Sequence, residues 1–223
     1  MHKVTAKRLV IPLFAFSFLG TATGYTEPLS TAALVPGRLC GSLEKAPGGF
    51  GPFDYRTATS SQRHMVESHH FTTSVETLRA GHSGTLGGDI DYTLRAFPNH
   101  PRALMAMMRL ADRTRTGQPT GARYLVECYF DRAIRFRPQD PSVRALYAYF
   151  LTKNDRHNEA KQQLLIGETI PNIPSDVAYN FGLAWFELGD FERSYRYAKQ
   201  AYSEGIELSG LRDKLRKAGH WPN

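Results

Sequence analysis

The segment RALMAMM at residues 102–108 has the same pattern as RALYAYF at residues 144–150, and each copy directly follows a proline or comes soon after one, at Pro101 and Pro141. Proline is accepted in the first turn of a helix because the amide hydrogen it lacks would have no partner there. Between the second and third copies the register is 34 residues, which aligns Ala148 with Gly182. This self-similarity predicts tandem helix pairs that share one packing pattern.

The third copy shows the repeated pattern most clearly. In order along the chain it contains Phe181-Gly182, Trp185, Gly189-Asp190-Phe191, Ser194 and Ala201. This series resembles the tetratricopeptide repeat, which has Leu-Gly, an aromatic residue, Gly-x-Tyr and two small residues at these places. The resemblance covers three repeats over residues 101–206. It implies an all-α fold: a short right-handed superhelix of antiparallel helix pairs, a tetratricopeptide-like solenoid with a loop-rich N-terminal segment.

Each position that matches the repeat pattern has a physical reason. A small residue at Gly182 lets the two helices of one pair approach closely, and a large one at Trp185 fills the space between pairs. Gly189 is expected to end the first helix of the pair in a left-handed conformation, which glycine adopts without strain. The pattern also has departures, because residues 114–121 are an extra segment and residues 152–157 lack the turn glycine.

The first 24 residues have the layout of a secretory signal peptide. Basic residues at Lys3, Lys7 and Arg8 precede an apolar run over residues 9–19, and small residues follow up to Gly24. The run is about half of the ~20 residues that a membrane-spanning helix needs, so we expect cleavage after Gly24 and no integral membrane segment in the mature chain. The sequence therefore predicts a periplasmic or secreted protein.

The segments on either side of the repeats have different characters. Residues 25–59 are rich in glycine, proline and aromatic residues and are expected to form an extended leader whose rings pack on the body. Residues 60–100 are expected to be helical and to include a degraded half repeat. Within them Thr73 and Glu76 have capping-box spacing before a stop at Gly81, and a helix over 89–97 has acidic residues in its first turn. Residues 207–223 should form a capping helix, over 211–218, and a tail.

The charge of the chain gives no reason to expect a nucleic-acid partner. The formal net charge is +7, and removal of three basic residues with the signal peptide lowers it to +4. The remaining basic residues are interleaved with acidic ones along the helices instead of forming a stripe. A protein or peptide partner is the better expectation.

The two cysteines that remain after removal of the signal peptide, Cys40 and Cys128, leave two interpretations open. In an oxidising compartment they could form a disulfide between the N-terminal segment and the repeats. Alternatively, both are unpaired, and Cys128 is a small apolar residue on a packed helix.

The resemblance implies that the first helices of the repeats line a groove that binds a peptide or helix of another protein. Carried onto this sequence, the partner-binding residues are Leu104, Met107, Leu146, Tyr149, Lys153, Tyr179, Asn180, Leu183 and Phe186. This wall is apolar and aromatic with few charges. The family's clamp for a C-terminal carboxylate needs Lys and Asn on successive first helices, and Ala103 and Met107 stand where the first pair should be, so we do not predict that specificity. Two alternatives remain: Met107 and Leu110 could pack against the N-terminal half, or the leader could fill the groove.

We predict no catalytic residues, no metal ligands and no cofactor. His64, Glu67, His69 and His70 are the densest set of possible ligands, but their order differs from His-Glu-x-x-His and other zinc motifs. The glycine-rich loop 81–88 lacks the Gly-Lys-Ser/Thr ending of a phosphate-binding loop. The alternative function is a metal- or small-molecule-binding or accessory enzymatic role for the His- and Asp-rich region 54–100.

Overall fold

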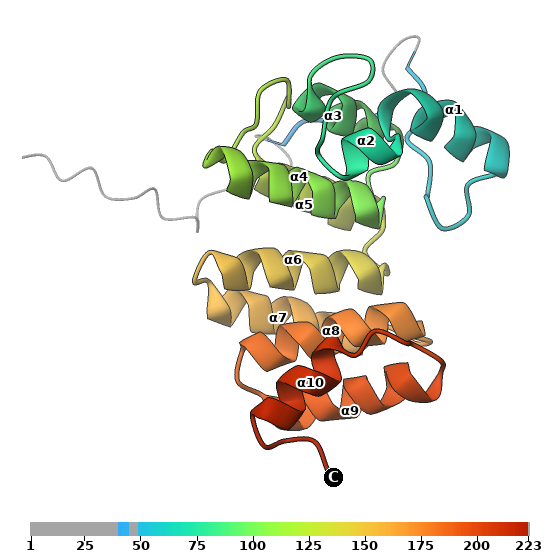
Figure 1. Ribbon diagram of the computed structural model, residues 1–223. Helices are drawn as coiled ribbons and strands as arrows, with labels where there is room; N and C mark the ends of the chain where they lie inside the picture. The colour runs from blue at the N-terminus through green and yellow to red at the C-terminus, as the bar shows by residue number, and fades with distance from the viewer. Residues whose placement is uncertain (1–39, 45–48, 223) are drawn as a thin grey trace, which may run out of the picture. The chain divides into compact units, whose positions relative to one another are not determined.

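The computed structural model describes residues 40–44 and 49–222, and all regular secondary structure in these residues is α-helical (Figure 1). The predicted all-α class is thus confirmed for this part of the chain. The helices are α1 Ser60–His70, α2 Thr73–Glu76, α3 Leu86–Ala96, α4 Pro101–Thr114, α5 Val126–Phe136, α6 Pro141–Lys153, α7 His157–Glu168, α8 Ser175–Glu187, α9 Phe191–Ser203 and α10 Gly210–Lys217. The predicted signal peptide and residues 25–39 of the leader lie outside the described residues. No helix of the described part has the length and apolar character needed to cross a membrane.

The helices α4 and α6 begin at the prolines that the sequence marks. His100 precedes α4, and its side chain accepts a hydrogen bond from the amide of Ala103 at 3.3 Å. Asp140 precedes α6 and accepts in the same way from the amide of Ser142 at 3.0 Å. Both caps satisfy amides that have no partner within the helix, so each helix start is fixed by a proline together with a capping side chain.

Helices α6 and α7 form one packed pair, and α8 and α9 form the next. A tight turn joins the two members of each pair, so they run in opposite directions. Gly189 makes the second turn with φ +75°, as predicted, and Asp155 makes the first with φ +58°. Aspartate is among the residues that tolerate this left-handed conformation, which explains how the second repeat forms its turn without glycine. Figure 1 shows the first helices of the repeats, α4, α6 and α8, in succession, and α6 packs against both of the others.

Small and large residues of α8 have the packing roles that the repeat pattern predicts. A β-carbon on Gly182 would lie 3.3 Å from the carbonyl oxygen of Ser194 and 3.4 Å from the amide of Ala198, so α8 and α9 approach closely there. The Ser194 hydroxyl donates to the carbonyl of Gly182 at 2.8 Å across the same contact. Trp185 is 1% exposed, belongs to the core cluster shared by α6, α7, α8 and α9, and donates its indole N–H to Glu168. It therefore fills the space between the two pairs.

The region between residues 60 and 97 differs from the prediction in where its helices begin and end. The capping box belongs to Thr59 and Gln62 at the start of α1, whereas α2 begins after Thr72 without a side-chain cap. Leu78, with φ +58°, makes the turn after α2, so the predicted stop at Gly81 is wrong. Both errors have the same cause: Val75 and Leu78 are buried, and this packing overrides the local capping signals.

Helix α3 begins three residues before the predicted start at Asp89. Thr85 is its N-cap and accepts a hydrogen bond from the amide of Gly88 at 3.1 Å. Two glycines that we expected in the loop therefore belong to the helix. The helix requires glycine at position 87, because a β-carbon on Gly87 would collide with the backbone of Thr120. Asp89 stays in the first turn, and Asp91 falls beyond it.

The C-terminal helix α10 covers the last pair, as predicted for a cap. Leu211 and Leu215 are both fully buried, in a cluster with Ala198 of α9. Helix α10 packs against α8 as well as α9. It consequently shields apolar surface that the last repeat would otherwise expose.

The described part of the leader is fixed to the side of the molecule formed by α3 and α5. A disulfide joins Cys40 to Cys128 of α5, which settles the alternative left open by the sequence. The amide of Phe53 donates to the carbonyl of Ala96 at 2.8 Å, and the Phe53 ring lies 6.1 Å from that of Phe97. The predicted packing of the leader's aromatic rings onto the body is therefore confirmed for Phe50, Phe53 and Tyr55.

Candidate binding groove

Two adjoining hollows lie along the first helices of the three repeats. Their volumes are about 310 and 360 Å³, and both are lined by Met105, Arg109, Leu146 and Asn180. Tyr149 and Leu183 complete the apolar part of the larger hollow, with Lys214 of α10 at its edge. Because they share four lining residues, the hollows form one continuous depression over α4, α6 and α8. We call this depression the groove.

The floor of the groove is apolar, and its rim is charged. Met108 and Leu146 are buried beneath it, while Met105, Tyr149 and Leu183 are half-buried. The rim residues are Glu76, Arg102, Arg109, Asp112, Asp176, Glu187 and Lys214. Four of these residues form two ion pairs, because Arg102 lies 3.1 Å from Glu76 and Lys214 lies 2.9 Å from Glu187. Such a surface suits a segment that has both apolar and charged side chains.

On α6 and α8 the residues that line the groove follow the 34-residue register. Leu146 and Asn180 occupy equivalent positions, as do Tyr149 and Leu183. The sequence predicted all four as partner-binding residues, and the structure brings them together in one hollow. The repeat pattern thus locates the groove wall on these two helices.

On α4 the groove is lined by Met105 and Met108, each one position after the predicted residues Leu104 and Met107. Leu104 and Met107 are 1% and 0% exposed and belong to the core cluster that includes Val75 of α2 and Ile90 of α3. Their predicted place on the groove wall is corrected to a place in the core beneath it. Packing against the N-terminal helices was the alternative for Met107 and Leu110, and both are buried in that cluster.

The residues of α4 that line the groove are Pro101, Arg102, Met105, Ala106, Met108, Arg109 and Asp112. The sequence does contain a signal for this face. Arg109 and Asp112 are exposed charges at helical spacing from Met105, which marks that stripe as the solvent side.

The remaining predicted wall residues lie near the groove but have partners within the chain. The hydroxyl of Tyr179 accepts a hydrogen bond from the amide of Leu211 at 3.2 Å. The ammonium of Lys214 lies 5.2 Å from the centroid of the Phe186 ring. Helix α10 thus contacts two aromatic residues that we had expected on an open wall. Lys153 is exposed, with its ammonium 6.0 Å from the Tyr149 ring.

The described part of the leader lies elsewhere. None of residues 40–44 and 49–59 lines either hollow. Arg56 of the leader donates a hydrogen bond to the carbonyl of Gln139, and Tyr55 stacks on His100. This segment therefore lies beside the residues that precede α4 and α6. These residues leave the groove open.

A polar cluster fixes the leader to the start of α4. Glu67 accepts hydrogen bonds from the Tyr55 hydroxyl at 2.9 Å and from His100 Nε2 at 3.2 Å. His100 is 0% exposed, and its Nδ1 already accepts from the amide of Ala103, so Nε2 carries the hydrogen. The Tyr55 and His100 rings stack 3.9 Å apart. The polar groups of this cluster satisfy one another's hydrogen bonds, so the cluster has a structural role and holds the leader against the start of α4.

The pKa values of the cluster predict that acid destabilises the protein. The hydrogen bond from His100, aided by Tyr55 and Arg102 against the effect of burial, lowers the pKa of Glu67 from 4.5 to about 2. Burial lowers the pKa of His100. A pKa that is lower in the folded state means that the unfolded state binds the proton first, so stability is lost as the pH falls.

We therefore expect the unfolding free energy to fall by about 2–3 kcal/mol between pH 4.5 and pH 2 through Glu67 alone. Urea titrations at several pH values should show a weaker pH dependence in Glu67→Gln than in the unsubstituted chain. Glu207, which is exposed, provides the control Glu207→Gln. Equal pH dependence in the chain and in Glu67→Gln would contradict the assignment.

A second network lies beside this cluster and joins three segments of the chain. Asn99 is 1% exposed, and its side-chain amide donates to Asp54 at 2.7 Å and to Asp140 at 2.8 Å. Its carbonyl oxygen accepts from the amide of Tyr55 at 3.0 Å. Arg137 contacts Asp54 from the other side, at 2.8 Å. One amide thus connects the leader, the turn before α4 and the turn before α6.

The His- and Asp-rich region was the basis of the alternative function. Among the described residues, no three His, Cys, Asp or Glu side chains are grouped so that they could hold a metal ion. His70 instead contacts Asp89 at 3.0 Å, and Asp89 also accepts from the amides of His82 and Ser83. These contacts hold α1 and the loop before α3 together.

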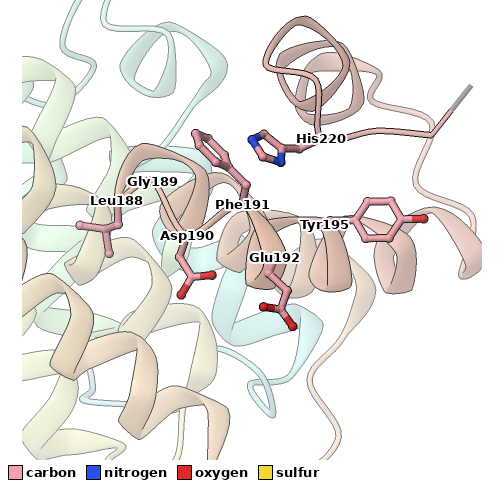
Figure 2. A pocket seen from close by; sticks show the side chains of 7 residues that line it. All are labelled: Leu188, Gly189, Asp190, Phe191, Glu192, Tyr195 and His220. Atoms are coloured by element: carbon pink, nitrogen blue, oxygen red, sulfur yellow. The ribbon is translucent and has the colours of Figure 1, made fainter.

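A further hollow of about 600 Å³ lies at the turn between α8 and α9 (Figure 2). The rings of Phe191 and His220 lie against each other with centroids 4.2 Å apart. The carboxylates of Asp190 and Glu192 point away from this ring pair, and Asp190 contacts Arg193 at 2.9 Å. Because its polar groups do not converge on one point, this hollow is a weaker candidate than the groove.

In the part of the chain that the structure describes, the regular structure is all-helical, and an apolar, charge-rimmed groove lies over α4, α6 and α8. Comparison of the chain with protein-family models, with curated proteins and with solved structures finds no match.

Proposed function

We propose that this chain is a non-catalytic scaffold of the tetratricopeptide type, whose groove binds a peptide or helix of another protein. The groove over α4, α6 and α8 is the observation that carries the proposal. In the tetratricopeptide family the first helices of the repeats line the binding surface, and here the same helices line the groove. The 34-residue register supports the assignment to that family and the superhelical arrangement that goes with it.

The chemistry of the groove favours an amphipathic partner segment. Tyr149 offers a large apolar area with a polar hydroxyl, and Met105 has a flexible side chain that adapts to different shapes. Arg109 and Asp112 are exposed charges of opposite sign at the rim. The partner therefore inserts apolar side chains into the floor and pairs charged ones with the rim.

We further propose that the protein works outside the cytoplasm, in the periplasm or after secretion. The signal-peptide pattern of residues 1–24 supports this location. The disulfide between Cys40 and Cys128 supports it independently, since such bonds persist in oxidising compartments. The partner is then another protein of the cell envelope or its surroundings.

Affinity capture with groove variants tests this function. With the chain as bait in its native compartment, Tyr149→Ala combined with Leu183→Ala should reduce recovery of a specific partner at least tenfold. A tenfold loss is about 1.4 kcal/mol, which is less than the ~2 kcal/mol that truncation of a hot-spot residue costs at an interface. Circular dichroism of each bait checks that the helices remain.

The outer face of α7 provides the matched control. Lys161 and Leu165 are exposed there, and neither lines the groove. The double variant Lys161→Ala and Leu165→Ala should capture the same partner as the unsubstituted chain. If the α7 variant loses the partner and the groove variant retains it, the binding surface is on the other side and the proposal fails.

A further inference from the structure

A small hollow of about 190 Å³ lies between the leader and helices α3 and α5, apart from the groove. Ser42, Glu44 and Phe50 line it from the leader, and Tyr92 and Arg95 line it from α3. Arg123, Tyr124 and Arg132 close the third side. Three guanidinium groups thus surround a space with room for one small polyatomic ion.

Arg132 is the least expected of the three arginines, because it is buried and no carboxylate among the described residues pairs with it. It is 5% exposed. Its Nη1 donates to the carbonyl oxygens of Cys40 at 3.0 Å and Ser42 at 2.7 Å, and its Nε has no hydrogen-bond acceptor among the described residues. Burial lowers the pKa of Arg132, because its charge is taken out of water while its direct hydrogen bonds within the described part of the chain go only to backbone carbonyls.

The other two arginines share one carboxylate that is already occupied. Arg95 lies 2.9 Å and Arg123 lies 3.6 Å from Asp91. Asp91 also accepts hydrogen bonds from the Tyr129 hydroxyl at 2.6 Å and from the amide of Arg123 at 3.2 Å. Counting the exposed carboxylate of Glu44, two negative charges face three positive ones in the lining and its support. Among the described residues, the lining and its support therefore have an excess of one positive charge.

Aromatic rings hold two of the guanidinium groups in place. The Arg95 guanidinium carbon lies 5.1 Å from the centroid of the Tyr92 ring, and that of Arg132 lies 4.8 Å from the Tyr124 ring. A guanidinium that is stacked in this way loses little further freedom when it binds an anion. The donors are thus arranged before a ligand arrives.

We propose that this hollow binds a single oxyanion, either a phosphate group or a carboxylate, held by Arg95, Arg123 and Arg132. Guanidinium groups match the geometry of both oxyanions. The bound charge neutralises the excess positive charge and gives the buried Arg132 the counterion it lacks. Bound between the leader and α3 and α5, the anion also holds these segments together, so binding stabilises the fold.

Calorimetric titration of the disulfide-bonded chain with inorganic phosphate, and separately with acetate, tests the proposal. Ionic strength is held constant with sodium chloride, because screening alone weakens such contacts. We expect saturable binding of one ion per chain for at least one probe, and the tighter probe identifies the chemistry of the ligand. Arg123→Gln should weaken that binding at least tenfold, because a charge-assisted hydrogen bond is lost.

Arg123 is suitable for substitution because its side chain is 61% exposed and it lies in the loop before α5. The matched control is Arg79→Gln, which removes an exposed arginine that does not line the hollow and should leave the affinity within twofold. Circular dichroism confirms that both variants are folded. The proposal is overturned if neither probe binds saturably, if Arg123→Gln binds as tightly as the unsubstituted chain, or if Arg79→Gln loses as much.

Discussion

Replacement of Asn99 by alanine should lower the free energy of unfolding by about 3–5 kcal/mol. The Asn99 amide is the donor that lies between the buried carboxylates of Asp54 and Asp140, and its carbonyl oxygen is the acceptor for the amide of Tyr55. Without it, two carboxylates face each other with one donor fewer each, and a backbone amide loses its partner. Urea unfolding followed by circular dichroism measures the effect.

An exposed asparagine gives the baseline for this experiment. Asn158 lies on the solvent side of α7, and Asn158→Ala should change the unfolding free energy by no more than about 0.5 kcal/mol. The network would have no structural role if Asn99→Ala and Asn158→Ala had the same small effect. A loss confined to Asn99→Ala supports its place at the junction of the leader, α4 and α6.

Removal of the disulfide should have an effect of similar size. Cys40 and Cys128 are separated by 88 residues, and closing a loop of this length stabilises a protein by about 4 kcal/mol in the chain-entropy model. The double variant Cys40→Ala and Cys128→Ala should therefore unfold at a clearly lower urea concentration than the oxidised chain. Since small domains are stable by only about 5–15 kcal/mol, this is a large part of the total.

A reducing agent provides the internal control. Dithiothreitol should destabilise the unsubstituted chain to nearly the level of the double variant and leave the double variant unchanged. If the reduced and oxidised chains unfold at the same urea concentration, the bond contributes nothing to the folded state. The expected loss also extends to the oxyanion hollow, because Arg132 donates to the carbonyl of Cys40.

The repeat half of the chain could be predicted well because each signal there is local. Pro101 and Pro141 mark helix starts, Gly189 marks a turn, and the small residue at Gly182 marks a close contact between helices. Each of these residues acts on neighbours within one helix pair, and the pairs recur at a fixed spacing. The pattern therefore predicts the helices, their pairing and the groove residues of α6 and α8.

The groove face of α4 could not be predicted in the same way. Its sequence has two apolar stripes, one through Leu104 and Met107 and another through Met105 and Met108. The apolar periodicity alone cannot say which stripe faces the core, and the charged residues Arg109 and Asp112 are the only local signal that the second stripe faces solvent. The decision depends on α2 and α3, whose residues Val75 and Ile90 cover the first stripe.

The polar cluster around His100 and the network around Asn99 could not be predicted from the sequence either. Asn99 meets partners that are 45 and 41 residues away in the chain, and no spacing rule connects them. In the sequence Asp54, Asn99 and His100 are visible only as members of the His- and Asp-rich region 54–100. In the structure they join the leader to the first repeat.

Photocrosslinking from position 149 tests the central claim, that the groove over α4, α6 and α8 binds another protein, most directly. A photoreactive amino acid replaces Tyr149, the chain is irradiated in its native compartment, and the crosslinked partner peptide is mapped by mass spectrometry. A second chain has the photoreactive residue at Lys161 on the outer face of α7. We predict that one segment of one partner crosslinks from position 149 and does not crosslink from position 161. Absence of any adduct specific to position 149, or the same adducts from both positions, would contradict the proposed function.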